Sequence, residues 1–308
     1  MYSDQVELKT LFDDFLCRHK LSASYVDIAQ TWFIPMAESL VMHQKSAGGT
    51  LFVGVNGTQG SGKSTLCDFL LEYLTSMHNL HVISMSLDDF YYSSQIRQDL
   101  AETVHPLFAT RGVPGTHDVV CMQKTFEALA AQETPLTIPR FNKATDNPYE
   151  ESDWLQVKQP VDIVLMEGWC WGVRSQNDKS LEEPVNTLEA IEDVAASWRR
   201  YVNAVLKKDY EPLYDYMHYW VMLLAPSFSA VHDWRCEQEH KLKVALGEAD
   251  PEKLAGLMSD EAIARFIMHY QRLTEHGLAS LPETCDTVYE LDFNRRVING
   301  SIEGEKPV

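Results

Sequence analysis

The chain has 308 residues, of which 45% are hydrophobic and 23% are charged. This composition is that of an ordinary globular protein and excludes the disordered and fibrous classes. The formal net charge of −19 argues against nucleic acid as a general partner, because phosphate backbones are bound by clustered Lys and Arg. We therefore expect any anionic ligand to bind in a local basic pocket.

The sequence favours a cytoplasmic location. Its six cysteines are scattered and form no C-x-x-C pair, which is typical of a reducing compartment. Residues 1–9 are mostly polar and lack the apolar stretch of a signal peptide, so we expect a protein that is not secreted. The longest apolar runs are far shorter than the ~20 residues of a membrane helix, and we expect no membrane partner.

The first predicted element is an amphipathic helix over residues 26–43, in which Pro35 favours a kink or a split. Gly48 and Gly49 end it. We expect residues 1–49 to form an N-terminal helical extension that packs on a larger domain of residues 50–308.

Five buried strands and several helices are predicted in the larger domain. The strands are 50–55, 82–85, 161–166, 219–224 and 288–291. The helices are 66–77, 120–132, 187–206, 228–246 and 259–276. The alternation of strands and helices favours a doubly wound α/β fold with a mainly parallel five-stranded sheet.

A glycine-rich loop separates the first strand from its helix and matches G-x-x-x-x-G-K-[ST]. Such a loop points successive backbone N–H groups at one oxyanion, and the helix dipole adds to the attraction. Lys63 is expected to reach the β- and γ-phosphates, and the Ser64 hydroxyl to bind Mg²⁺. The residues predicted to bind a nucleoside triphosphate are Gly57, Thr58, Gln59, Gly60, Ser61, Gly62, Lys63, Ser64 and Thr65.

This loop alone does not separate kinases from GTPases or ATPases. A guanine-specific GTPase carries N-K-x-D, whereas residues 142–146 read N-K-A-T-D, with the acid one place too late. The sequence therefore disfavours guanine recognition.

Two acids, Asp88 and Asp89, follow the second strand, where a carboxylate would lie beside the γ-phosphate. In phosphoryl transfer to a hydroxyl, an Asp takes the acceptor's proton. Asp88 is the predicted base. The alternative is that this acid only caps a turn or a helix.

Several strings resemble one family of enzymes. They are S-L-D-D-F-Y at 86–91, H-P-L-F-A-T-R-G-V-P-G-T-H-D at 105–118, I-P-R-F-N-K-A at 138–144 and E-G-W at 167–169. With the glycine-rich loop, they make residues 50–295 similar to the D-glycerate 3-kinase family, in the uridine kinase, phosphoribulokinase and pantothenate kinase branch of P-loop kinases. The R-G-x-P-G-T-H-D string is far more specific than the loop.

The resemblance implies transfer of the γ-phosphoryl group of ATP to a hydroxyl of a small hydroxy acid, most simply D-glycerate to 3-phosphoglycerate. Glu167 joins Ser64 as a predicted Mg²⁺ ligand. Arg111 is predicted to be catalytic with Lys63 and Asp88, and to grip a substrate carboxylate in two-pronged fashion. A structural role in its loop is the alternative. The residues predicted to bind the acceptor are Asp88, Tyr91, Arg111, His117, Asp118 and Arg140.

The chain departs from the family pattern at two places. Asn142 stands where the family often has Asp, and the expected Arg-rich lid reduces here to Arg235. Two other functions stay open: a kinase for a nucleoside, pantothenate or a sugar phosphate, and a nucleotide-binding regulatory protein without turnover. The sequence leaves the oligomeric state undecided.

Overall fold

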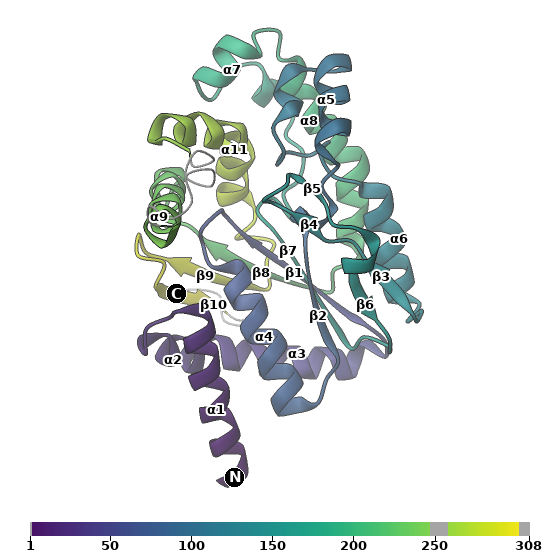
Figure 1. Ribbon diagram of the computed structural model, residues 1–308, viewed down its shortest axis with the longest axis vertical. Helices are drawn as coiled ribbons and strands as arrows, with labels where there is room; N and C mark the ends of the chain where they lie inside the picture. Colours follow the sequence, from purple (N-terminus) through teal and green to yellow (C-terminus); the bar gives the residue numbers. More distant parts are fainter. Residues whose placement is uncertain (1, 247–257, 302–308) are drawn as a thin grey trace.

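The computed structural model describes residues 2–246 and 258–301 and has a six-stranded central sheet (Figure 1). Its strand order is β10-β9-β8-β1-β7-β2. The strands are β1 (Leu51–Gly57), β2 (Val82–Ser86), β7 (Ile163–Gly168), β8 (Tyr219–Leu224), β9 (Thr287–Leu291) and β10 (Val297–Ser301). The first five pair in parallel, which confirms the predicted sheet. The antiparallel edge strand β10 was not predicted, because its residues V-I-N-G-S form no apolar run.

The strand register brings the predicted site residues to one edge of the sheet. Glu167 near the end of β7 lies opposite Val55 of β1 on one side and opposite Ser86 of β2 on the other. The glycine-rich loop follows β1, and Asp88 follows β2. Because the carboxyl ends of parallel strands meet at the same edge, the three segments converge there.

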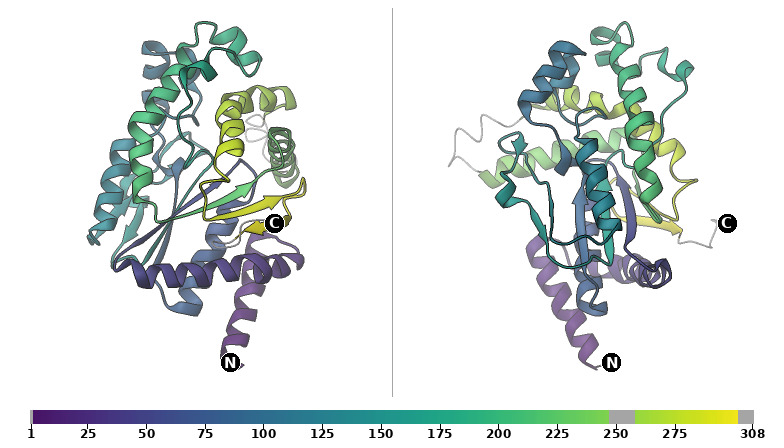
Figure 2. Two further views of the ribbon diagram at one scale, coloured as in Figure 1. Left: turned by 180° about the vertical axis from the view of Figure 1, so that it is seen from behind. Right: turned by 90° about the vertical axis from the view of Figure 1, so that its right-hand side faces the viewer.

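Helices cover both faces of the sheet. On one face lie α1 (Tyr2–His19), α3 (Ile34–Ala47) and α4 (Lys63–His78), and on the other α6 (Val119–Ala130) and α8 (Ser197–Val205). Strand β1 alternates between them: Val53 and Val55 pack with the first group, and Phe52 packs with the second. Figure 2 shows the N-terminal helices at one end of the molecule and α8 extending toward the other.

The remaining elements are short or peripheral. They are α2 (Ser24–Ile28), α5 (Ser94–Thr103), α7 (Thr187–Glu192), α9 (Phe228–Leu246), α11 (Asp260–Ser280), β3 (Leu136–Ile138), β4 (Phe141–Asn142), β5 (Asn147–Pro148) and β6 (Leu155–Val157). Of these, α9 and α11 match the predicted helices closely, whereas α5 was not predicted.

Helices α2 and α3 follow one another without an intervening loop. Between α2 and α3 the chain makes a π-helical turn over Ala29–Phe33, and Pro35 lies directly after it in the first turn of α3. Helix α1, which was not predicted, places Phe12 and Phe15 against Phe69 of α4, with ring centroids 5.8 and 5.6 Å apart. The extension therefore shares a hydrophobic core with the helix that follows the glycine-rich loop.

The single helix predicted over 187–206 is wrong, because the chain breaks between α7 and α8. Ala196 adopts a left-handed conformation with φ 58°. The Asp193 carboxylate accepts hydrogen bonds from the backbone N–H groups of Trp198 and Arg199, at 2.8 and 3.1 Å. An Asp side chain competes with helix continuation by capping the next helix, and here the cap is favoured.

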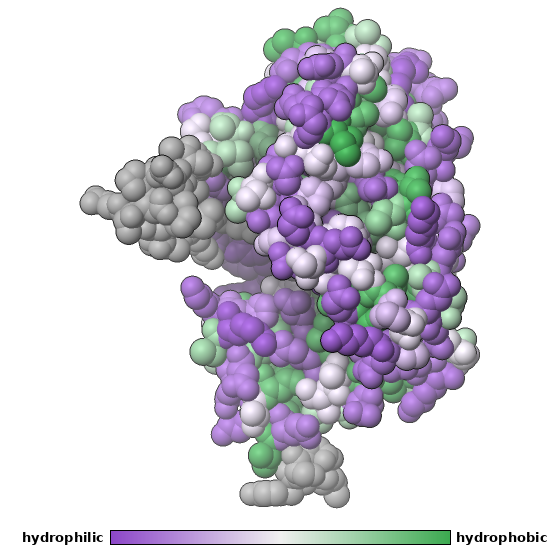
Figure 3. All heavy atoms as spheres, turned by 45° about the vertical axis from the view of Figure 1, so that its right-hand side comes forward, coloured by the Kyte–Doolittle hydropathy of each residue, from purple (hydrophilic) through white to green (hydrophobic). Residues whose placement is uncertain are grey.

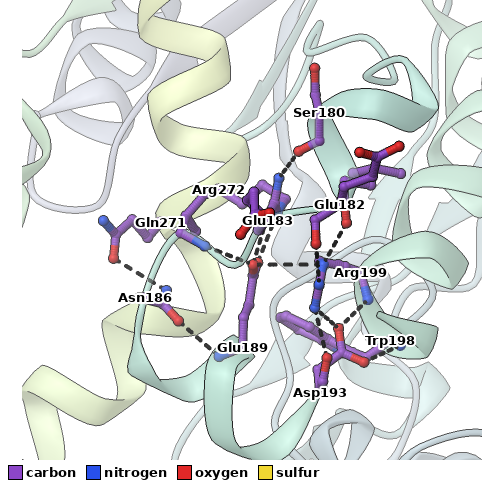
Figure 4. Close-up of polar contacts among 12 residues, drawn as sticks. Ser180, Glu182, Glu183, Asn186, Glu189, Asp193, Trp198, Arg199, Gln271 and Arg272 are labelled. Atoms are coloured by element: carbon purple, nitrogen blue, oxygen red, sulfur yellow. Dashed lines mark hydrogen bonds and ion pairs between the residues drawn. The ribbon is translucent and has the colours of Figure 1, made fainter. Parts of the chain in front are cut away.

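A buried ion cluster ties helix α11 to the segment around α7 (Figure 4). The Arg272 guanidinium donates to both carboxylate oxygens of Glu189, at 2.8 and 2.6 Å, and Arg199 pairs with Asp193 at 2.9 Å. Arg272 also donates to the carbonyls of Ser180 and Glu183. The cluster fixes α11 against the segment around α7.

The surface seen in Figure 3 is mainly hydrophilic, with apolar residues in small separate groups. Within residues 2–246 and 258–301, no helix combines the length and the apolar character that crossing a bilayer requires.

Candidate active site

The glycine-rich loop runs from the end of β1 to the start of α4. Gly60 and Gly62 have φ values of 79° and 95°, which side chains rarely adopt. Three buried polar atoms of the loop have no hydrogen-bond partner among the described residues: Thr58 Oγ1, Gln59 Oε1 and Ser61 Oγ. Burying unpaired polar atoms is costly, so the loop is arranged for a polar ligand.

Glu167 lies directly beside the loop. Its Oε1 accepts a hydrogen bond from the Ser64 hydroxyl at 2.8 Å, and its Oε2 lies 3.6 Å from Lys63 Nζ. The side chain is buried, and Oε2 has no hydrogen-bond partner among the described residues. A hydroxyl and a carboxylate are oxygen donors that fit Mg²⁺. The described residues contain no cluster of three or more His, Cys, Asp or Glu side chains suited to a metal, so nucleotide phosphates would have to supply further ligands.

The two acids after β2 have different surroundings. Asp89 accepts from the Ser86 backbone N–H at 2.9 Å and pairs with Arg140 at 2.7 Å, so it caps the turn. Asp88 instead lies 2.6 Å from Lys143 Nζ at the cavity. Burial opposes ionisation of Asp88, but the positive charge of Lys143, helped by Lys63, lowers its pKa below the usual value. Burial raises the pKa of Asp89. Asp88 is thus the acid held as a carboxylate toward the cavity.

In the structure, Arg140 stabilises the turn that contains Asp89. Besides Asp89, its guanidinium donates to the carbonyl of Ser84 at 3.2 Å. Its predicted contact with the acceptor remains a prediction.

Two side chains from other parts of the chain hydrogen-bond to the backbone of the loop that carries Arg111. Tyr270 of α11 donates its hydroxyl to the Arg111 carbonyl at 2.8 Å, and Trp169 donates its indole N–H to the Gly112 carbonyl at 2.9 Å. The Arg111 guanidinium forms an ion pair with Asp146 and lies over the Phe141 ring, 5.7 Å from its centroid. The side chain is about one quarter exposed, at 28%. Because the guanidinium already pairs with the carboxylate of Asp146, its surroundings suit the predicted contact with a substrate carboxylate.

His117 is buried and shares a hydrogen bond with the Tyr210 hydroxyl. The Gly115 N–H donates to the Tyr210 hydroxyl oxygen at 3.2 Å, so the hydroxyl hydrogen is free to donate to His117 Nδ1, 2.7 Å away. With the hydroxyl as the donor to Nδ1, the proton of the imidazole is on Nε2, which has no partner among the described residues. Burial lowers the pKa of His117 to about 3, so the ring is a neutral N–H donor.

Two residues predicted to bind the acceptor, Tyr91 and Asp118, lie next to His117 and make different contacts. Tyr91 stacks on its ring with centroids 4.4 Å apart. Burial raises the pKa of Tyr91, and the charge of Asp88 and a hydrogen bond to it raise the pKa further. Asp118 instead caps α6 by accepting from the Cys121 N–H at 2.9 Å. Tyr91 and His117 therefore lie with Asp88, whereas the predicted contact of Asp118 with an acceptor remains untested.

The predicted lid helix is α9. Its Arg235 pairs with Glu239 one turn later, at 2.8 Å, and its Trp234 packs on the glycine-rich loop so closely that a Cβ at Gly60 would lie 2.9 Å from the Trp234 Cβ. A contact between Arg235 and a nucleotide remains a prediction.

A cavity of about 650 Å³ lies over the loop. This volume is in the range of small-molecule sites. It is lined by the loop residues 59–66, by Asp88 and Lys143, by Trp234, Asn294 and Arg295 from the C-terminal half, and by Tyr25 and Phe33 from the N-terminal helices.

Four residues that contact the site residues were not predicted: Lys143 beside Asp88, Tyr210 beside His117, Tyr270 beside Arg111, and Arg97, which pairs with Asp146 at 2.5 Å. Lys143 belongs to the I-P-R-F-N-K-A string, but nothing in that string indicates that its ammonium pairs with Asp88. The other three come from segments without a motif, and no local signal marked them.

The mainly parallel sheet and the glycine-rich loop at its carboxyl edge give the chain the P-loop α/β fold, as predicted. No family model matches the sequence. The chain is 30% identical over 240 residues to the uncharacterized kinase mug58 of Schizosaccharomyces pombe, an overlap of 73% of this chain and 80% of that protein. It is 28% identical over 236 residues to the chloroplastic D-glycerate 3-kinase of Arabidopsis thaliana, an overlap of 71% of this chain and 46% of that longer protein.

A solved structure agrees with these relatives. The D-glycerate 3-kinase of Cryptococcus neoformans var. grubii superposes with a TM-score of 0.74 at 25% identity, covering 89% of this chain and 98% of that one. The chain belongs to the D-glycerate 3-kinase family, within the P-loop kinases, and is an ATP-dependent kinase. The Arabidopsis relative is a chloroplast protein by name, and the cytoplasmic location expected for this chain stays a prediction.

Proposed function

We propose that the chain transfers the γ-phosphoryl group of ATP to a hydroxyl of D-glycerate and forms 3-phosphoglycerate. The observation that carries the proposal is the position of Asp88, an ionised carboxylate that lines the nucleotide cavity with Lys63 and Ser64, where a hydroxyl acceptor needs a base. Family membership supports glycerate, as does Arg111, which already binds a carboxylate in the structure.

The step follows from these groups. The acceptor hydroxyl gives its proton to Asp88 while its oxygen forms a bond to the γ-phosphorus, and the bond from that phosphorus to the β,γ-bridging oxygen breaks, releasing ADP. Lys63 neutralises charge on the transferred group. Ser64 and Glu167 would hold Mg²⁺, which when bound supplies charge neutralisation at the phosphates.

Arg111 and His117 would orient the acceptor. A guanidinium binds a carboxylate with two parallel hydrogen bonds, so Arg111 would fix the acid end of glycerate after exchanging Asp146 for it. The unpartnered Nε2–H of His117 is a donor suited to a substrate oxygen.

An acceptor panel tests the proposal. We would measure ADP release with D-glycerate, L-glycerate, glycerol, pantothenate, uridine and ribulose 5-phosphate, and identify the product by phosphorus NMR. We expect turnover with D-glycerate and a phosphomonoester at its terminal carbon. Preferred turnover of uridine, pantothenate or the sugar phosphate would replace glycerate by that acceptor. ATP binding without turnover of any compound would favour a regulatory protein.

A further inference from the structure

Lys143 lies at the boundary between the predicted base and the nucleotide cavity. Its Nζ is 2.6 Å from Asp88 Oδ2, and it lines the same cavity as Lys63 and Ser64. Its side chain is 62% exposed, so the ammonium can be hydrated when it leaves Asp88. Its pairing with Asp88 is the one role described for this lysine so far.

The turn that carries Lys143 is firmly anchored. Between β4 and β5, Asp146 forms ion pairs with Arg111 and with the buried Arg97, the latter at 2.5 Å. Arg97 also donates to the carbonyls of Tyr92 and Ala109. The turn is therefore tied to the acceptor side of the site, and Lys143 extends from it to Asp88 on a long, flexible side chain.

The contact between Lys143 and Asp88 indicates how close the ammonium lies to the transferred phosphoryl group. If Asp88 accepts the acceptor's proton, the attacking oxygen lies within about 2.7 Å of that carboxylate, and the γ-phosphorus lies directly beyond the oxygen. An ammonium that contacts the same carboxylate is then within reach of the phosphoryl oxygens. Lys63, which also lowers the pKa of Asp88, approaches from the P-loop side.

A lysine that only paired with Asp88 would oppose catalysis, because it makes the carboxylate a weaker base. The position of Lys143 beside Asp88 can assist catalysis once Asp88 has taken up the proton of the acceptor hydroxyl. Once Asp88 is protonated it no longer attracts the ammonium, while negative charge has accumulated on the phosphoryl group beside it. The ammonium can then donate to the phosphoryl oxygens.

We propose that Lys143 is a catalytic residue that binds the equatorial oxygens of the phosphoryl group during transfer, on the side opposite Lys63. This inference rests on the proposed function in one respect, that Asp88 is the base for an attacking hydroxyl. It does not depend on which small molecule carries the hydroxyl. No bond beyond those of the transfer step is made or broken.

Turnover of variants is the first test. Lys143→Gln should lower kcat by about 10²–10³, the usual worth of one positioned donor to a developing charge, while KM for ATP changes much less. Lys143→Arg should restore part of the rate, since it keeps the charge. Lys158→Gln, at an exposed lysine of the β6 end, is the matched control and should behave as wild type.

Binding of ADP with aluminium fluoride and Mg²⁺, a mimic of the transferring phosphoryl group, is the second test and needs no acceptor. Lys143→Gln should bind this mimic at least about tenfold more weakly than wild type while binding ADP alone equally well. If wild type does not turn over D-glycerate, the proposed acceptor fails, and this measurement still decides the role of Lys143.

Three results would overturn the inference. One is equal affinity of wild type and Lys143→Gln for the mimic, whatever happens to kcat, since the lysine would then act only through Asp88. Another is a kcat of Lys143→Gln close to that of wild type. The third is a faster Lys143→Gln variant, which would make the lysine a competitor of the acceptor for Asp88.

Discussion

Replacing Arg272 by methionine should destabilise the fold, because it leaves a buried carboxylate without its main partner. The guanidinium makes two hydrogen bonds to Glu189, and the two side chains are 8% and 1% exposed. Methionine keeps much of the length and the apolar contacts of the arginine stem, so the charge and its hydrogen bonds are what is lost.

The size of the loss follows from what remains around Glu189. Removing one partner of a buried ion pair costs about 3–5 kcal/mol. The Val185 N–H still donates to the carboxylate at 3.0 Å, and the Arg199 Nε lies 4.0 Å away. The carbonyls of Ser180 and Glu183 belong to exposed residues and can be hydrated. We therefore expect the lower end, about 3 kcal/mol.

Urea unfolding of wild type and variants measures this loss. Arg265→Met is the matched control on the same helix, because Arg265 pairs with Glu192 at an exposed site and should cost only about 0.2–1 kcal/mol. Adding Glu189→Met to Arg272→Met should restore most of the stability, since no buried charge is then left unpaired. Equal losses for Arg272→Met and Arg265→Met would refute the argument from burial.

Three further predictions concern the site. Arg111→Lys should raise KM for D-glycerate more than KM for ATP, because a single ammonium cannot replace a two-pronged contact. Initial-rate assays measure both constants, and equal increases would indicate that Arg111 contacts the nucleotide instead. Glu167→Gln should raise the Mg²⁺ concentration that gives half-maximal rate, and an unchanged titration would remove Glu167 from the metal site. Burial lowers the pKa of His117 to about 3, so the unfolded chain takes up a proton there between pH 6.5 and 3 that the folded chain does not. The free energy of unfolding should fall as the pH is lowered through this range, by up to about 1.4 kcal/mol per unit from this group. His117→Gln should flatten the slope in urea titrations at several pH values, and an identical slope would contradict a neutral buried ring.

The parallel sheet and the glycine-rich loop could be predicted because their signals are local. Each strand is an apolar run of a few residues, and the loop combines glycines that need positive φ with a lysine at fixed spacing. The helix over 187–206 failed because the same apolar spacing continues across Asp193, whose capping of the next helix depends on a turn that periodicity does not report. Helix α1 is stabilised mainly by distant contacts with Phe69, which its own residues do not indicate.

The site was only partly predictable for the same reason. Asp88 and Asp89 are adjacent and chemically identical in the sequence, and only the partners Lys143 and Arg140 distinguish the carboxylate at the cavity from the one that caps the turn. These partners lie more than fifty residues away along the chain. Tyr210, whose hydroxyl lies 2.7 Å from His117 Nδ1, is 93 residues away from it along the chain and belongs to no motif.

The central claim, that Asp88 is the base of a hydroxyl kinase, is tested most directly by the rate of phosphoryl transfer from ATP to D-glycerate in Asp88→Asn. The variant keeps the size of the side chain and deletes its basicity, so kcat should fall by about 10²–10⁴ with ATP affinity retained. Asp89→Asn, measured beside it, should cost less rate. A kcat within about threefold of wild type, well outside that range, would contradict the claim, and loss of ATP binding would make Asp88 part of the nucleotide site instead.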